Sequence, residues 1–279
     1  MENFIQEVLH GPPFIRHALY VALCSSLAVG ISGTLVVINR ISYLAAAISH
    51  TALGGIGMSL FAIGVWQWQA IEPWMGALVI SIASAIAITW IRAHTHERID
   101  TAIGALWCTG MAIGLLFLHA TPGYIEPMHY LFGNILLVGQ PQLIMALMLD
   151  IILLAVFTIY WRPIYAVSLD ESFARARGLS VDTYYALMLS MIALTIVILV
   201  YLVGIILVIA MLTLPAAIAG RFTCRLFSQI AMTALVALLI QVAGIFISYA
   251  LDWPTGATMV VVAALVYACT LAFPQAQRG

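Results

Sequence analysis

Long apolar runs constrain the fold of this chain more than any other feature. Nine runs have about the length of 20 residues that a helix needs to cross the hydrocarbon core of a bilayer. Lipid offers no water to satisfy exposed backbone groups, so such a run is expected to form a helix. The predicted spans are about residues 17–38, 47–66, 73–92, 101–119, 142–161, 183–202, 203–220, 227–250 and 257–273. The predicted fold class is all-α, a polytopic transmembrane helical bundle of about eight to nine spans.

The composition agrees with a membrane bundle and excludes several soluble classes. Hydrophobic residues make up 64% of the chain and charged residues 8%, whereas soluble domains are about one quarter charged. A net charge of −1 provides no basic face for nucleic acid. Four cysteines stand far apart without metal-binding spacing and are interpreted as small packing residues: Cys24, Cys108, Cys224 and Cys269. No linker divides the chain, so residues 1–279 are predicted to form one domain.

All ten cationic side chains are arginine, because the chain contains no lysine. A phosphate-binding loop of ATPases needs a lysine that reaches the terminal phosphates, so the chain is not expected to hydrolyse ATP by itself. Short loops rich in arginine stay in the cytoplasm. If Arg40 is inside and the spans alternate, the other cytoplasmic arginines are Arg92, Arg98, Arg162, Arg175, Arg177, Arg221, Arg225 and Arg278.

Only Arg16 then lies outside, so the N-terminus is predicted outside and the C-terminus in the cytoplasm. The apolar segment 127–140 contains Gly133, Asn134 and Gly139 and is interpreted as a short or re-entrant helix. Counting it as a full span would break the charge pattern.

The longest predicted cytoplasmic segment, about residues 162–182, is expected to hold a short amphipathic helix. Ser168 is placed to cap its start, and Gly178 is placed to end it in a left-handed turn. Phe173 and Ala174 are available to pack against another surface, either a partner protein or lipid headgroups. Charged residues suit the helix dipole at both ends: Asp170 and Glu171 near the start, Arg175 and Arg177 near the end.

The stretch D-E-S-F-A-R-A-R-G-L at 170–179 resembles the coupling loop of permeases in ATP-binding cassette importers. More specifically, the chain resembles the permease family that imports zinc, manganese or iron(II). Five further stretches match that family in order: I-N-R-I-S-Y-L-A-A-A-I-S-H at 38–50, D-T-A-I-G-A-L at 100–106, Y-L-F-G-N-I-L at 130–136, V-G-I-I-L-V-I-A-M-L-T-L-P-A-A-I-A at 203–219 and L-D-W-P-T-G-A-T-M-V at 251–260.

The resemblance implies a transport subunit and no enzyme: a single membrane-embedded permease domain in the cell membrane. It implies a permease homodimer, a cytoplasmic ATP-binding cassette ATPase and an extracytoplasmic metal-binding protein. No cofactor is implied, and the divalent zinc, manganese or iron ion is the cargo. The residues that would couple the permease to its ATPase are Asp170, Glu171, Phe173, Ala174 and Gly178.

His50 and Asp150 are the candidate metal-contacting residues. Each is an ionisable group inside a predicted span. Such groups are costly to bury in a membrane, so their presence indicates a functional role. The family has a histidine at the position that matches His50, and imidazole ligates zinc, manganese and iron alike. Many members carry an acidic residue four positions earlier, where this chain has Ala46. Asp150 is the candidate for a replacement ligand from another span. A structural hydrogen bond is the alternative for both residues.

The remaining polar candidates lie in loops. His119, Glu126 and His129 fall near the predicted outer mouth, where they could receive a metal ion or simply be solvated. The H-T-H-E motif at 94–97 could chelate but is more typical of a polar turn. Asn134 replaces an acidic residue that is common in the family.

Three alternatives remain beside the ATP-driven metal permease. An ion-coupled secondary metal transporter would need several carboxylates within its spans, where Asp150 is almost alone. A membrane enzyme would need a clustered motif such as H-E-x-x-H, which the sequence lacks. A permease for an iron-chelate would also dock an ATPase, but such chains are typically longer.

Overall fold

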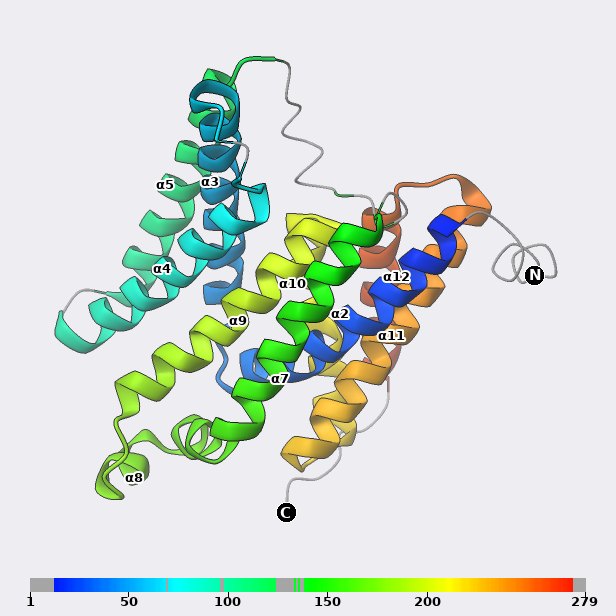
Figure 1. Cartoon of the computed structure of the whole chain (residues 1–279). Helices are drawn as coiled ribbons and strands as arrows, with labels where there is room; N and C mark the ends of the chain where they lie inside the picture. Colours follow the sequence, from blue (N-terminus) through cyan, green and yellow to red (C-terminus); the bar gives the residue numbers. More distant parts are fainter. Residues whose placement is uncertain are drawn as a thin grey trace.

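A computed structural model describes residues 13–68, 70–95, 98–123, 133, 135 and 138–272. Within these residues the elements are α-helices, and no strand occurs (Figure 1). Their bounds are Pro13–Ile38 (α2), Ser42–Trp66 (α3), Pro73–His94 (α4), Ile99–Ala120 (α5), Gln140–Leu169 (α7), Glu171–Ala176 (α8), Val181–Val203 (α9), Ile205–Phe222 (α10), Leu226–Leu251 (α11) and Thr255–Leu271 (α12).

The helices confirm the predicted all-α transmembrane bundle. Eight of them in the described part of the chain are long and apolar enough to cross a membrane, and α12 is a shorter apolar helix of 17 residues. Each predicted span falls on one of these nine helices. Most of the predicted re-entrant segment 127–140 lies outside the described residues.

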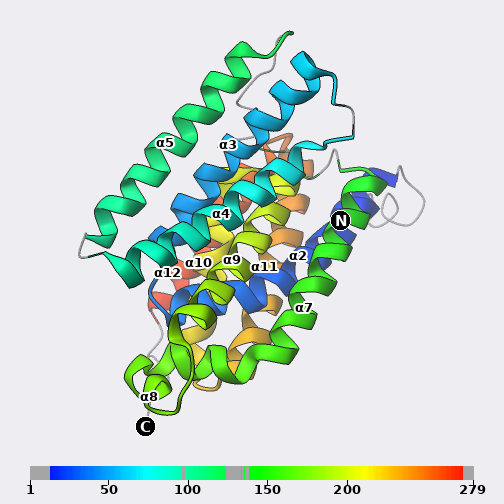
Figure 2. The same cartoon turned by 60° about the vertical axis from the view of Figure 1, so that its left-hand side comes forward.

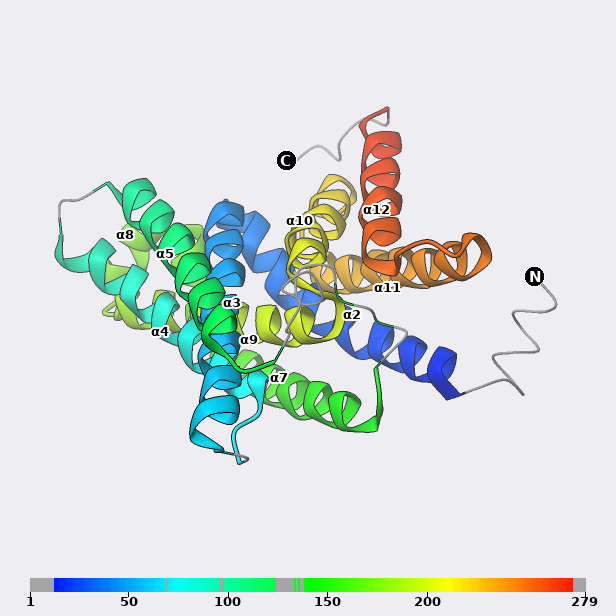
Figure 3. The ribbon, with the colours of Figure 1, turned by 90° about the horizontal axis from the view of Figure 1, so that it is seen from above.

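Helix α9 occupies the centre of the bundle. It packs against α2, α3, α4, α7 and α10, and every residue from Met191 to Val200 is buried. Seen from above in Figure 3, α3, α4 and α5 lie on one side of α9, and α11 and α12 lie on the other. A helix that is apolar all round, as α9 is, belongs at the centre of such an assembly.

Helices α3, α4 and α5 pack with their backbones in close approach. A Cβ atom on Gly55 of α3 would overlap the backbone of Gly76 on α4. Small residues permit such contacts where lipid provides no hydrophobic driving force. The same close approach joins α3 to α5, at the pairs Gly54–Gly110 and Gly57–Gly114. We refer to α3, α4 and α5 below as the three-helix unit.

Helix α7 is longer than the sequence predicted. It has 30 residues and continues to Leu169 through Pro163, so the predicted segment 162–182 begins as helix and not as a loop. The extension is stable because Ile164 and Val167 are buried against neighbouring helices. Helix α8 lies at this end of the bundle, between the end of α7 and the start of α9 (Figure 2).

Candidate functional site

Asp170, not Ser168, caps the short helix α8. The Oδ1 atom of Asp170 accepts hydrogen bonds from the backbone N–H groups of Ser172 at 2.8 Å and Phe173 at 3.0 Å. Ser168 lies in the last turn of α7, where its hydroxyl donates to the carbonyl of Ile164 at 2.8 Å. The prediction that Ser168 caps this helix is wrong because α7 continues past it. A carboxylate in this position stabilises the helix start by satisfying two N–H groups that lack partners within the helix.

Gly178 ends α8 as predicted. Its φ of 78° lies in the left-handed region, which side chains disfavour. The N–H of Gly178 donates to the carbonyl of Arg175 at 2.9 Å, and the N–H of Leu179 donates to the carbonyl of Ala174 at 3.0 Å. These two bonds form a Schellman motif, which fixes the direction in which the chain leaves the helix.

A small apolar core, separate from the main one, holds α8 in place. Its buried members are Val167 of α7, Ala174 of α8 and Val181 of α9. Ala174 is fully buried, so in this conformation it supports the helix and cannot contact a partner protein, contrary to its predicted role at the surface. Phe173 is 56% exposed, and the guanidinium of Arg177 lies 5.8 Å from the centre of its ring.

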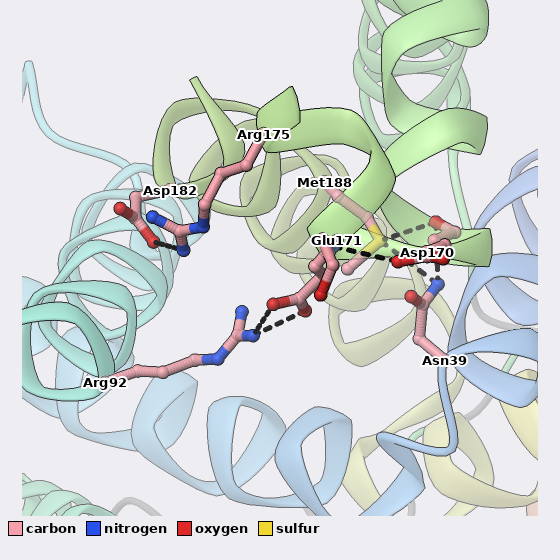
Figure 4. Close-up of polar contacts among 9 residues, drawn as sticks. Asn39, Arg92, Asp170, Glu171, Arg175, Asp182 and Met188 are labelled. Atoms are coloured by element: carbon pink, nitrogen blue, oxygen red, sulfur yellow. Dashed lines mark hydrogen bonds and ion pairs between the residues drawn. The ribbon is translucent and has the colours of Figure 1, made fainter. Parts of the chain in front are cut away.

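Glu171 forms an ion pair with Arg92, in the last turn of α4 (Figure 4). Both carboxylate oxygens of Glu171 accept hydrogen bonds from the Nη2 atom of Arg92. The guanidinium of Arg92 also lies 4.1 Å from the centre of the Tyr185 ring on α9. Sequence reasoning used Arg92 only to orient the chain and missed this pair, because 79 residues separate its partners.

Asn39 and Arg175 make further polar contacts, which Figure 4 shows. The Nδ2 atom of Asn39, just after α2, donates to the hydroxyl of Ser168 at 3.1 Å and approaches the sulfur of Met188 at 3.3 Å. Arg175 lies 3.7 Å from Asp182, and both side chains are about half exposed. Asn39 thus joins the end of α2 to α7 and α9, and Arg175 joins α8 to the start of α9.

His50 lies on α3 with its ring stacked on Trp107 of α5. The ring centres are 4.7 Å apart and the ring planes differ by 16°. The Nδ1 atom of His50 is buried and has no hydrogen-bond partner among the described residues. The alternative of a structural hydrogen bond at His50 therefore has no support at Nδ1 in this part of the structure. Ala46, one turn earlier, is buried and offers no ligand atom.

Asp150 lies on α7, which is not one of the helices of the three-helix unit. Both of its carboxylate oxygens are buried without a hydrogen-bond partner in the described part of the chain. No group of three or more His, Cys, Asp or Glu side chains that could hold a metal ion occurs there either. His50 and Asp150 are thus not parts of a three-ligand cluster within the described residues.

The other sequence candidates contribute less to this description. Glu126, His129 and Asn134 lie outside the described residues, as do His96 and Glu97 of the H-T-H-E motif. His119 is exposed in the last turn of α5. The Nδ1 atom of His94 lies 3.1 Å from the carbonyl oxygen of Trp90.

Known proteins resemble this chain along nearly its whole length. It is 33% identical over 264 residues to a probable metal transport system membrane protein of Chlamydia trachomatis, covering 93% of this chain and 89% of the relative. It is 29% identical over 278 residues to the manganese import system permease protein ScaB of Streptococcus gordonii, covering 100% of this chain and 97% of the relative.

A solved structure shares the fold. The structure of PsaBC from Streptococcus pneumoniae in complex with Fab contains a chain that is 27% identical, with a TM-score of 0.86, and the match covers 98% of this chain and 96% of the other. The model of the ABC 3 transport family matches residues 12–274. The match thus covers nearly the whole chain, including His50 and α8. The chain belongs to the ABC 3 transport family.

Proposed function

We propose that the chain is the membrane permease subunit of an ATP-driven importer for a divalent transition metal. The observation that carries this proposal is the likeness, along nearly the whole chain, to proteins named as metal or manganese permeases. Manganese is the favoured cargo because the ScaB proteins of two Streptococcus species, both named for manganese import, match at 29% identity. Zinc and iron(II) remain the comparison ions.

Energy enters through a separate ATPase, since this chain has no lysine for a phosphate-binding loop. Helix α8 is the docking helix of the proposal. It is short, capped at both ends and displays Phe173 and Arg177 outward. Closure of the ATPase on this helix would bias the bundle between two arrangements, one open to each side of the membrane.

The docking helix lies on the side of the bundle that carries most of the described arginines. Arg40, Arg98, Arg221 and Arg225 occupy the turns or helix ends at that side, by the alternation of consecutive helices. Arginine-rich turns stay in the cytoplasm, which supports a cytoplasmic docking helix. The complex would further contain a second copy of this chain and an extracytoplasmic metal-binding protein, which delivers the ion to the other side.

His50 is the residue that we propose to contact the ion in transit. Its Nδ1 atom is buried within an apolar helix and has no partner among the described residues. An unpaired buried nitrogen is costly unless it binds something. Manganese, iron and zinc all accept an imidazole ligand, and an oxygen from another span, with Asp150 as the candidate, would complete the contact.

Transport by the purified complex tests this function. The chain is co-purified with its ATPase, reconstituted into vesicles and supplied with radioactive manganese, with zinc and iron(II) as competitors. We expect manganese accumulation that needs both the ATPase and hydrolysable ATP. A non-hydrolysable ATP analogue serves as the control. Accumulation driven by an ion gradient in vesicles that lack the ATPase would instead identify a secondary transporter.

A further inference from the structure

We infer that Arg92 is a positioning residue for energy coupling, which links the docking helix α8 to the three-helix unit through Glu171. This inference rests on the proposed function, because it assumes that an ATPase acts on α8. It adds the route by which a movement of α8 reaches the helix that carries His50.

The Arg92–Glu171 pair is shielded from water more than the other ion pair of α8. The side chain of Arg92 is 23% exposed and that of Glu171 is 40% exposed, against 60% and 47% for Arg175 and Asp182. Arg92 is further covered by the buried ring of Tyr185. A charge-assisted pair that is partly desolvated holds its geometry better than an exposed one.

The ion pair reaches a helix that the apolar core of α8 does not. Val167 and Val181 attach α8 to α7 and α9, and the described members of this small core include no residue of α4. Glu171 contacts α4 through Arg92, which lies near its end. The pair is therefore a direct connection from the docking helix to the three-helix unit.

Helix α4 in turn is packed tightly to the helix of His50. The backbones of Gly55 and Gly76 meet between α3 and α4, and those of Gly54 and Gly110 meet between α3 and α5. The atoms nearest to a Cβ on Gly54 or Gly55 would be backbone atoms of the facing helix, which cannot rotate away as a side chain can, so the three helices are expected to shift together. A displacement of Arg92 would then move His50 and its stacking partner Trp107 with it.

The test measures metal transported per ATP hydrolysed in vesicles that contain the chain and its ATPase. We expect Arg92→Gln and Glu171→Gln each to lower this ratio about fivefold, the lower end of typical coupling energies. ATP hydrolysis and co-purification with the ATPase should persist. The reversed pair, Arg92→Glu with Glu171→Arg, should recover part of the ratio. Arg98→Gln, which removes a nearby positive charge at the start of α5, is the matched control.

The outcomes separate the inference from the proposed function. If the wild-type complex transports metal and Arg92→Gln has an unchanged ratio, the inference is overturned while the function stands. Equal loss in all charge variants, including Arg98→Gln, or loss of ATPase binding in Arg92→Gln, would also overturn it. If the wild-type complex shows no ATP-dependent transport, the proposed function itself fails. Glu171→Gln tests the same pair should Arg92→Gln not fold.

Discussion

His50 combines a restrained ring with a buried Nδ1 atom. Its ring is fixed by stacking on Trp107, and its Nδ1 atom has no hydrogen-bond partner in the described part of the chain. Stacking restrains the ring without occupying the nitrogen lone pair. The side chain is therefore held in place with Nδ1 still available, which is what the proposed metal contact requires.

Replacing His50 with Ala should lower metal uptake about tenfold, because even residues that only support a metal ligand are worth that much. Assembly with the ATPase should persist, since the substitution leaves α8 untouched. Initial uptake rates in vesicles provide the measurement. His94→Ala, at the exposed end of α4, is the matched control. Wild-type uptake by His50→Ala would remove His50 from the pathway.

At the residue scale, the sequence predicted local features well and distant pairs poorly. Gly178 was predictable because a left-handed helix end favours glycine whatever surrounds it. Asp170 was predicted at the start of the short helix, but its capping role was not, because the cap position depends on where α7 ends. Arg92 and Glu171 lie 79 residues apart, and no local pattern reports such a contact.

At the scale of elements, the close packing of α3 on α4 is the most sensitive interface. Gly55→Ala would place a methyl group on the backbone of Gly76, so the helices would have to separate. We expect a destabilisation of about 1–3 kcal/mol, as for other overpacked cores. Thermal unfolding in detergent provides the measurement. Gly104→Ala, whose methyl group would meet nothing within 4 Å, should leave the melting temperature unchanged, and equal values for both variants would contradict the close approach.

The helices themselves were predictable because a long apolar run in lipid has to form a helix to satisfy its backbone hydrogen bonds. The boundary between the spans 183–202 and 203–220 is an example: Gly204, with a φ of 86°, stands between α9 and α10. The end of α7 was not predictable in this way. Arg162 and Pro163 indicated a loop, yet burial of Ile164 and Val167 continues the helix to Leu169.

For the whole molecule, the alternation of helices divides the turns between two sides. Cys224 is exposed between α10 and α11, on the side of the docking helix, and Trp253 lies at the other end of α11. A variant that keeps Cys224 and replaces Cys24, Cys108 and Cys269 with Ala should react with a membrane-impermeant maleimide only in inside-out vesicles.

The matched control adds Trp253→Cys to a chain without other cysteines, and this variant should react only in right-side-out vesicles. Labelling of Cys224 from outside would contradict the proposed orientation and with it a cytoplasmic docking helix.

The arrangement of the helices around α9 could not be predicted from the sequence. Apolar periodicity identifies the buried face of a helix only where the other face meets water. In this bundle, both the exposed residues of α7, such as Ile151, and the buried residues of α9, such as Ile196, are apolar. The sequence therefore could not predict which helices pack against each other, although it predicted the all-α class and the approximate number of spans.

The small core beneath the docking helix has a thermodynamic consequence. Its buried members are three small side chains, Val167, Ala174 and Val181. The packing of α8 therefore buries less apolar surface than the packing of the helices around α9. The region around α8 is expected to open and reclose more often than the rest of the protein. A motor protein that grips the helix would suppress those openings, and amide hydrogens there would exchange with solvent more slowly in the complex than in the isolated permease.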